Sequence, residues 1–244
     1  MTLETIKTMP DAANGSCWSC GDMRAEHFCH SCGKVQPPVP TDYFAFFGLP
    51  RKLNLDVHAL EKDFYALSRK LHPDVYAQSS PREREWSEEQ SSRLNDAYRI
   101  LKDPIKRTEY LLKLEGVELE EQSKSATEAA RAKGELKKQV VPPALLEEVF
   151  ELNMELEEMR ANKKQGERDP ELVKQLEHHK QELEKQFDAL SHELKGDWTE
   201  WDKQVDKRPR EQDRKQILDK MVDLLNRRNY YRNLVRDVNE ALEA

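Results

Sequence analysis

All four cysteines of the 244-residue chain lie within its first 32 residues, as two Cys-x2-Cys pairs. They are Cys17, Cys20, Cys29 and Cys32. Two such pairs on a short connector can present four thiolates to one tetrahedral ion, and zinc is the metal that most often accepts this set. Four protein ligands leave no open coordination position, so the pattern favours one structural zinc ion. A redox-active dithiol pair, an iron centre and an unfolded tail are the other interpretations.

The tripeptide His72-Pro73-Asp74 is the second set of residues that could do chemistry. A catalytic His–Asp pair would need a nucleophile and a pocket, and no such constellation lies nearby in the sequence. Pro73 disfavours helical geometry at His72, so a helix should end there. The tripeptide is then either an ordinary helix stop or a contact surface held out between two helices.

The composition decides which elements position these groups. Charged residues make up 36% of the chain and hydrophobic residues 37%, with few glycines and aromatics, which favours an all-α fold. The net charge of −7 makes nucleic acid a poor default partner. No apolar run is long enough to span a bilayer, and the N-terminus resembles neither a secretory signal nor a transit peptide. We therefore expect a cytoplasmic protein with no membrane partner.

A four-helix segment is predicted after the prolines at positions 37, 38 and 40. Thr41 or Asp42 can cap a short first helix that Gly48 and Pro50 end. The second helix runs from 56 to 71 and has an apolar face formed by Leu60, Phe64, Leu67 and Leu71. Its opposite, basic face carries Lys62 and Arg69, with Lys70 at the flank. The third helix has the stripe Leu94, Ala97, Tyr98 and Leu101, and a short fourth helix follows Asp103-Pro104.

The C-terminal part predicts a linker and a three-helix bundle. Its first helix has the stripe Leu145, Val149, Leu152, Leu156 and Met159. Its second has Leu172, Leu176, Leu183, Phe187, Leu190 and Leu194, with His179 as a partly buried core residue rather than a ligand. Gly196 is expected to end that helix, with Trp198, Trp201 and Pro209 in the following loop. The third has Ile217, Met221, Leu224, Tyr231, Val235, Val238 and Leu242.

A second apolar strip lies off the core stripe of the first bundle helix. It consists of Leu146, Phe150 and Met154. It is either part of a wide face shared between two neighbouring helices or a surface for a partner protein.

The middle segment resembles a J-domain, on several stretches that stand in the order that family has them. They are Asp42-Tyr43-Phe44, Phe47-Gly48-Leu49, His72-Pro73-Asp74, Leu94-Asn95-Asp96-Ala97-Tyr98 and Tyr110-Leu111-Leu112-Lys113-Leu114. These sequence motifs are similar to those of the HscB-type iron–sulfur cluster co-chaperones. The two cysteine pairs resemble the N-terminal extension of the eukaryotic and some bacterial members. The resemblance implies residues 1–36 as a zinc-binding module with a disordered start, 41–116 as a J-domain, 117–143 as a linker and 144–244 as the bundle.

The resemblance also implies partners, and no enzyme activity of the chain's own. His72-Pro73-Asp74, aided by Lys62, Arg69 and Lys70, would bind a DnaK/HscA-type chaperone and stimulate its ATP hydrolysis. The bundle would bind an IscU-type iron–sulfur scaffold. The implied scaffold-binding residues are Leu146, Phe150, Glu151, Met154 and Tyr230, the last of which is expected to lie off the core stripe of its helix. Homodimerisation through the zinc module is left open.

Two other functions remain as alternatives. One is a J-domain co-chaperone whose bundle serves other protein clients or oligomerisation. The other is a zinc-ribbon regulator with a coiled-coil arm that binds nucleic acid, which the net acidity and the few basic residues around the cysteines disfavour.

Overall fold

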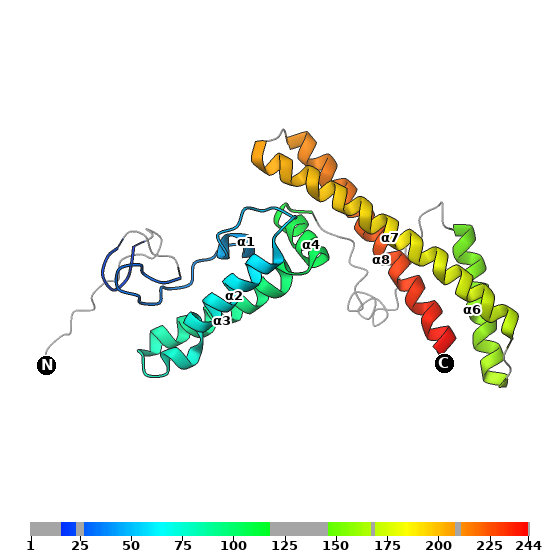
Figure 1. Cartoon of the computed structure of the whole chain (residues 1–244), viewed down its shortest axis with the longest axis horizontal. Coiled ribbons are helices and arrows are strands. Elements are labelled where there is room, and N and C mark those ends of the chain that lie inside the picture. The colour runs from blue at the N-terminus through cyan, green and yellow to red at the C-terminus, as the bar shows by residue number, and fades with distance from the viewer. Residues whose placement is uncertain (1–15, 23–26, 118–145, 167–168, 208–210, 244) are drawn as a thin grey trace, which may run out of the picture. The chain divides into compact units, whose positions relative to one another are not determined.

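The computed structural model describes residues 16–22, 27–117, 146–166, 169–207 and 211–243, with the side chains of residues 146–148 outside that description. Two compact units, Met1–Tyr110 and Leu111–Ala244, make up the chain. Every regular element among the described residues is a helix (Figure 1), which confirms the all-α prediction. None of the described helices is long and apolar enough to cross a membrane. The predicted linker, 117–143, lies almost wholly outside the described residues.

The first three helices begin at side-chain caps. Asp42 precedes α1 (Tyr43–Phe46) and accepts the N–H of Ala45 at 2.9 Å. Asp56 precedes α2 (Val57–Leu71) and accepts two backbone N–H groups. Ser80 and Glu83 form a reciprocal capping box at the start of α3 (Pro81–Leu101), where Pro81 costs no hydrogen bond. These caps satisfy backbone donors that the first helical turn leaves free, so they set where each helix starts.

Between α2 and α3 the tripeptide does not form a loose loop. Pro73–Tyr76 is one turn of 3₁₀ helix, η2, which follows directly on the end of α2 at Leu71. After α3, Asp103 caps α4 (Pro104–Leu114) through the N–H groups of Ile105 and Lys106.

The α2–α3 hairpin closes around an apolar core. Its buried members are Val35, Phe46, Leu71, Tyr76, Leu94 and Ala97, with Phe28, Tyr43, Phe47, Phe64, Leu67 and Trp86 partly buried against them. The predicted apolar faces of both helices point into this core. Val35 and Phe28 come from the cysteine-bearing segment, which the sequence analysis treated as a separate module.

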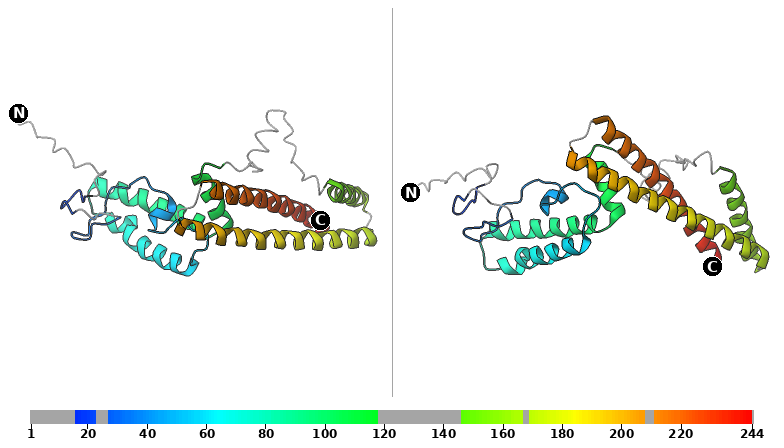
Figure 2. Two further views of the ribbon diagram at one scale, coloured as in Figure 1. Left: turned by 90° about the horizontal axis from the view of Figure 1, so that it is seen from above. Right: turned by 45° about the horizontal axis from the view of Figure 1, so that its top comes forward.

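The second unit is built on a long hairpin of α7 (Pro170–Lys207) and α8 (Glu211–Glu243), against which the shorter α6 (Leu146–Gln165) packs (Figure 2). Val149, Leu152, Leu156 and Met159 are buried along α6, as predicted. Leu145, also predicted on this stripe, lies outside the described residues. His179 is 31% exposed with its Nε2 3.3 Å from Glu155, in keeping with a partly buried core residue.

Gly196 does not end the second bundle helix, contrary to the prediction. The helix continues for eleven more residues to Lys207, and Trp198 and Trp201 lie within it, 6% and 1% exposed. A glycine inside a helix costs only about 1 kcal/mol, whereas burying a large apolar side chain contributes about 1.5–3 kcal/mol. Two buried tryptophans therefore outweigh the helix-breaking tendency of Gly196.

Replacing Gly196 by alanine should therefore stabilise the bundle by about 0.5–1 kcal/mol, because a Cβ there meets nothing within 4 Å and the residue is helical. Gly166 in the same unit is the matched control, since its φ of +74° predicts a cost of about 1–2 kcal/mol for Gly166→Ala. Hydrogen exchange of the α7 and α8 amides across a denaturant series measures both. A loss of stability in Gly196→Ala would contradict a continuous α7.

Candidate functional site

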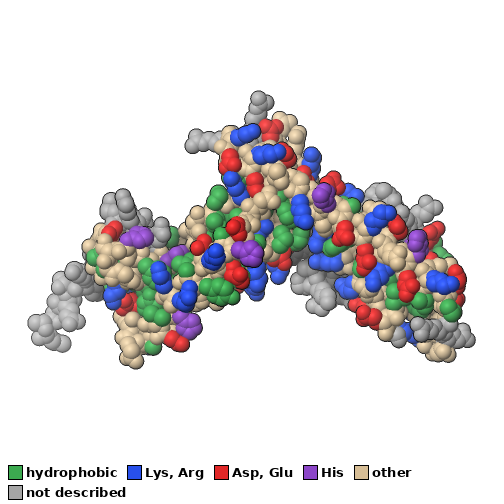
Figure 3. Space-filling model, viewed as in Figure 1, with side chains coloured by type: hydrophobic (Ala, Val, Ile, Leu, Met, Phe, Trp, Pro, Cys, Tyr) green, Lys and Arg blue, Asp and Glu red, His purple; other side chains and the backbone are tan. Residues whose placement is uncertain are grey.

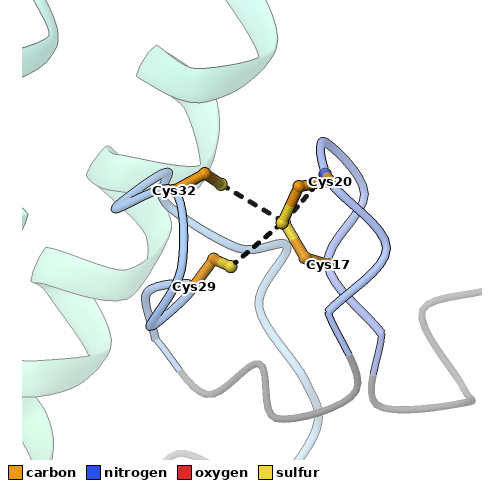
Figure 4. Close-up of side chains that lie close together, drawn as sticks. All are labelled: Cys17, Cys20, Cys29 and Cys32. Carbon is orange, nitrogen blue, oxygen red and sulfur yellow. Dashed lines mark hydrogen bonds between the residues drawn. The ribbon is translucent and has the colours of Figure 1, made fainter.

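The four cysteine sulfurs form a compact cage. All of them lie within 4.8 Å of one another. Figure 4 shows the side chains converging from two turns, Cys17–Asp22 and Cys29–Lys34, which we call the two hooks. Cys17 Sγ is 3.7 Å from Cys32 Sγ, and Cys20 Sγ is 3.4 Å from Cys29 Sγ. Zinc–sulfur bonds of about 2.3 Å in a tetrahedron separate the sulfurs by about 3.8 Å. The residues thus fit one tetrahedral metal ion.

The two hooks repeat one backbone design. In the first, Cys17 donates its N–H to the carbonyl of Asp22 at 2.6 Å, and its own carbonyl accepts the N–H of Gly21 at 2.9 Å. The second hook, Cys29–Lys34, repeats both bonds at 2.9 Å. Gly21 and Gly33 have φ of +80° and +70°, a conformation that glycine adopts without strain. The repeated turn aims two thiols of each hook at a common point.

Two of the thiols are buried and two are exposed. Cys17 is fully buried and Cys29 is 2% exposed. Burial raises the pKa of Cys17, but N–H donors from Cys20 and Ser19 outweigh it and lower this pKa to about 6. The pKa of Cys20 is raised to about 12, since the Asp22 N–H that lowers it is outweighed by the crowding thiols, Cys29 foremost. A metal ion binds the thiolate form of cysteine, so its binding would release the protons that these thiols hold.

His72 and Asp74 project into solvent. Their side chains are 55% and 91% exposed, while Pro73 is half-buried and opens η2. The Nδ1 atom of His72 accepts the backbone N–H of Asp74 at 3.3 Å. Ser87 of α3 donates its hydroxyl to the carbonyl of Leu71 at 2.7 Å, directly before the tripeptide. The three residues therefore form a shaped, accessible turn.

The predicted basic face of α2 is exposed. Lys62, Arg69 and Lys70 all lie on the surface, and Lys70 Nζ is also 6.0 Å from the centre of the Phe28 ring. Lys62 and Arg69 line a shallow groove together with Tyr65 and Ser68. Tyr65, 55% exposed, was missed by the sequence analysis. An aromatic side chain between basic residues on the polar side of a helix was the available signal.

On α6 the predicted apolar strip is exposed where the structure describes it. Phe150 is 66% and Met154 59% exposed, one helical turn apart, and the exposed Glu151 lies beside them. Of the two interpretations, a face shared between packed helices is wrong for Phe150 and Met154. Leu146 begins α6, but its side chain lies outside the described residues.

Tyr230 does not lie off the core stripe, and that prediction is wrong. Its side chain is only 3% exposed, next to the equally buried Tyr231, and burial raises the pKa of Tyr230 to about 12. The long α8 contacts both α7 and α6, so its buried face is wider than the single stripe assumed from periodicity.

On one face of the molecule, charge is mixed rather than gathered. On the face drawn in Figure 3, the described Lys and Arg side chains alternate with Asp and Glu, without a broad basic patch. This distribution gives no support to the nucleic-acid-binding alternative.

A helical hairpin with an exposed His-Pro-Asp turn defines the class of this protein, and the family description "DnaJ domain" matches residues 42–110. The chain therefore contains a J-domain over residues 42–110. Sequence relatives narrow this further. The mouse iron-sulfur cluster co-chaperone protein HscB is 41% identical over 111 residues, 43% of this chain and 47% of the relative. The Arabidopsis thaliana HscB homolog is 33% identical over 147 residues, 60% of this chain and 52% of the relative.

Solved structures extend the likeness beyond the J-domain. The crystal structure of human co-chaperone protein HscB aligns over 92% of this chain and 97% of its own, with a TM-score of 0.61 at 23% identity, which shows a shared fold. Chaperone HscB from Vibrio cholerae aligns over 83% and 98%, with a TM-score of 0.52 at 26% identity. The chain spans about half the length of the curated relatives it matches. Together these findings show that the chain is similar to HscB-type J-domain proteins in sequence and in fold.

The cage predicts one metal ion per chain. Because Cys29 is a buried member of the cage, Cys29→Ser should remove most of the bound metal. His30→Ala, an exposed neighbour outside the cage, is the control and should retain it. Elemental analysis of the purified proteins gives the ratio. A metal content that Cys29→Ser leaves unchanged would contradict the four-thiol site.

Proposed function

We propose that this protein is a co-chaperone of iron–sulfur cluster biogenesis that joins a scaffold protein to an ATP-hydrolysing chaperone. The single observation that carries the proposal is the exposed His72-Pro73-Asp74 turn in a J-domain of the HscB type. The mouse and Arabidopsis thaliana relatives are iron–sulfur cluster co-chaperones by name, which supports the same role here.

The J-domain would bind a DnaK/HscA-type chaperone. His72, Pro73 and Asp74 would form the contact that stimulates ATP hydrolysis on the chaperone. Lys62, Arg69 and Lys70 are exposed on α2, with Arg69 and Lys70 in its last turn before the tripeptide, and positive charge there would speed encounter with an acidic partner surface. Tyr65 adds an accessible aromatic ring to the same face.

The bundle would bind the IscU-type scaffold through the outer side of α6. Phe150 and Met154 are the only large apolar side chains more than half exposed among the described residues of the bundle, which supports a protein-binding role. Glu151 would contribute a polar contact and Leu146 would extend the strip by one turn. The burial of Tyr230 argues for removing it from the contact set.

Joining the two partners would be the chain's whole contribution. A scaffold held on the bundle is at high effective concentration for a chaperone held on the J-domain. ATP hydrolysis in the chaperone would then trap the scaffold, so the bond change takes place on another protein and this chain is no enzyme.

Zinc is our proposed occupant of the cysteine cage, because four thiolates at these separations suit it and leave no open position for catalysis. Cys17, Cys20, Cys29 and Cys32 would hold it, and it would supply folding energy to a segment too small to fold by apolar burial. The elemental analysis described above also separates zinc from iron. A cytoplasmic location stays a prediction.

Chaperone stimulation should depend on His72. We expect the wild-type chain to raise the steady-state ATPase rate of a DnaK-type chaperone and His72→Gln to abolish the increase, because the side chain is exposed and holds no core contact. His58→Gln, an exposed histidine at the other end of α2, is the matched control and should stimulate normally. Equal stimulation by His72→Gln and wild type would disprove the role given to the tripeptide.

Scaffold binding should depend on the α6 strip. Phe150→Ala with Met154→Ala should weaken binding of an IscU-type scaffold at least about tenfold, since central apolar contacts are worth about 2 kcal/mol or more each. Phe150→Leu, which keeps an apolar side chain, should restore most of the affinity lost in Phe150→Ala. Thermal unfolding should be unchanged in all variants, because both side chains are exposed. Isothermal calorimetry that finds no binding by wild type would favour a different protein client.

A further inference from the structure

The buried face of α3 is polar in the first half of the helix. Glu83, Ser87 and Gln90 are 4%, 0% and 2% exposed, and they continue toward the N-terminus the stripe that Leu94 and Ala97 form in the second half. Buried polar side chains need partners. For two of these three residues, a partner comes from the cysteine-bearing segment.

Gln90 is held from both ends of its amide. Its Nε2 donates to the carbonyl of Gln36 at 2.6 Å, and its Oε1 lies 2.8 Å from Nδ1 of His27. The other ring nitrogen of His27 lies 2.9 Å from the carbonyl of Phe46 in α1. Gln36 is itself 2% exposed and donates its side-chain amide to Cys17 Sγ at 3.3 Å. A chain of hydrogen bonds therefore runs from a cage thiol to the middle of α3.

Glu83 is held in the same way at the start of α3. One carboxylate oxygen accepts from Lys34 at 2.7 Å, and the other accepts the hydroxyl of Ser80 at 2.7 Å and its N–H at 3.1 Å. Lys34 lowers the pKa of Glu83, with Ser80 helping, so the carboxylate stays charged. Ser80 is the residue that closes the loop after η2. The second cysteine hook is thus tied to the far end of the tripeptide's loop.

Apolar contacts follow the same path. Val35, fully buried, belongs to the core that also contains Leu71 and Tyr76, the residues on either side of the exposed tripeptide. Phe28, which forms an isolated antiparallel bridge with Val35, packs against this core. Trp18, near the first hook, meets Trp86 of α3 edge to face with ring centres 5.5 Å apart. Side chains in or next to both hooks therefore pack against the hairpin that carries the tripeptide.

We infer that the cysteine cage is a positioning element for the His72-Pro73-Asp74 turn. An ion held by the cage fixes the second hook, which ends at Lys34 and is followed by Val35 and Gln36. These three residues hold the first half of α3. Ser87, on that same half, fixes the carbonyl of Leu71 at the end of α2. Loss of the ion then frees η2 and its loop to move while leaving α4 in place. This inference rests on the proposed function only for its activity readout.

The expected effect on activity separates affinity from maximal rate. A turn that is competent for only a fraction of the time raises the concentration needed for half-maximal stimulation by the inverse of that fraction. If the His72-Pro73-Asp74 turn is competent in about one molecule in five without the ion, the concentration for half-maximal stimulation rises about fivefold. The maximal ATPase rate at saturation stays the same, since His72 and Asp74 are untouched.

The experiment uses the full chain before chelation, after chelation and after readdition of Zn²⁺. Hydrogen exchange should accelerate over residues 72–80 on chelation, remain unchanged over residues 104–114, and recover with Zn²⁺. Stimulation of a DnaK-type chaperone should show the fivefold shift with an unchanged maximum. Acceleration of both segments alike, or of neither, would overturn the inference.

A substitution that spares the cage provides the second arm. Lys34→Ala removes the tie to Glu83 and should accelerate exchange over residues 72–80 at unchanged metal content. Arg99→Ala is the matched control, because it removes an ion pair of similar length (2.8 Å, to Asp96) on the exposed side of the same helix. Equal exchange in Lys34→Ala and Arg99→Ala would also overturn the inference. Absence of any stimulation by the wild-type holoprotein would instead refute the proposed function, and the exchange data would still decide the coupling.

Discussion

Leu71 occupies the point on which the exposed His72-Pro73-Asp74 turn depends. It is the last residue of α2, its side chain is fully buried against α3, and its carbonyl accepts the hydroxyl of Ser87. The next residue, His72, must leave the helix because Pro73 disfavours helical geometry before it. A buried helix end followed by a forced exit leaves the next three residues on the surface, with Asp74 91% exposed.

A hairpin of this size needs help to hold Leu71 in place. Small domains bury a limited share of their surface, and many rely on a metal or a disulfide for stability. The cysteine-bearing segment adds Val35 to the core and partners for the buried polar face of α3. The cysteine-bearing segment and the helical hairpin therefore pack against one another through apolar and polar contacts.

Periodicity and capping chemistry were enough to predict most of the helices and the exposed tripeptide. Asp42, one of the two residues expected to cap the first helix, does cap it, and α2 begins one residue after the predicted start. The apolar face of α2 that ends at Leu71 points into the core. Local signals failed where packing partners decide. Gly196 stays helical because two tryptophans that follow it in α7 are buried. The single apolar stripe predicted for α8 did not include the buried Tyr230.

The buried polar face of α3 was missed for a different reason. Glu83, Ser87 and Gln90 continue the spacing of Leu94 and Ala97, but polarity normally signals exposure. Only knowledge of the donors and acceptors that face them, such as Lys34 and Gln36, turns that pattern into a buried one. When the helical spacing of buried positions continues but the residues become polar, the pattern can indicate contact with another polar segment.

The two apolar sides of α6 raise the question of what the outer one is for. One side, from Val149 to Met159, is buried against α7 and α8, whereas Phe150 and Met154 remain in water on the other. Burying such a side chain contributes about 1.5–3 kcal/mol to stability. Phe150 and Met154 are exposed, so the folded chain alone does not gain this free energy. A bound protein recovers that energy, although part of it offsets the entropy lost on association. Two exposed apolar residues one helical turn apart then supply a contact that is specific but reversible, which suits the proposed adaptor role.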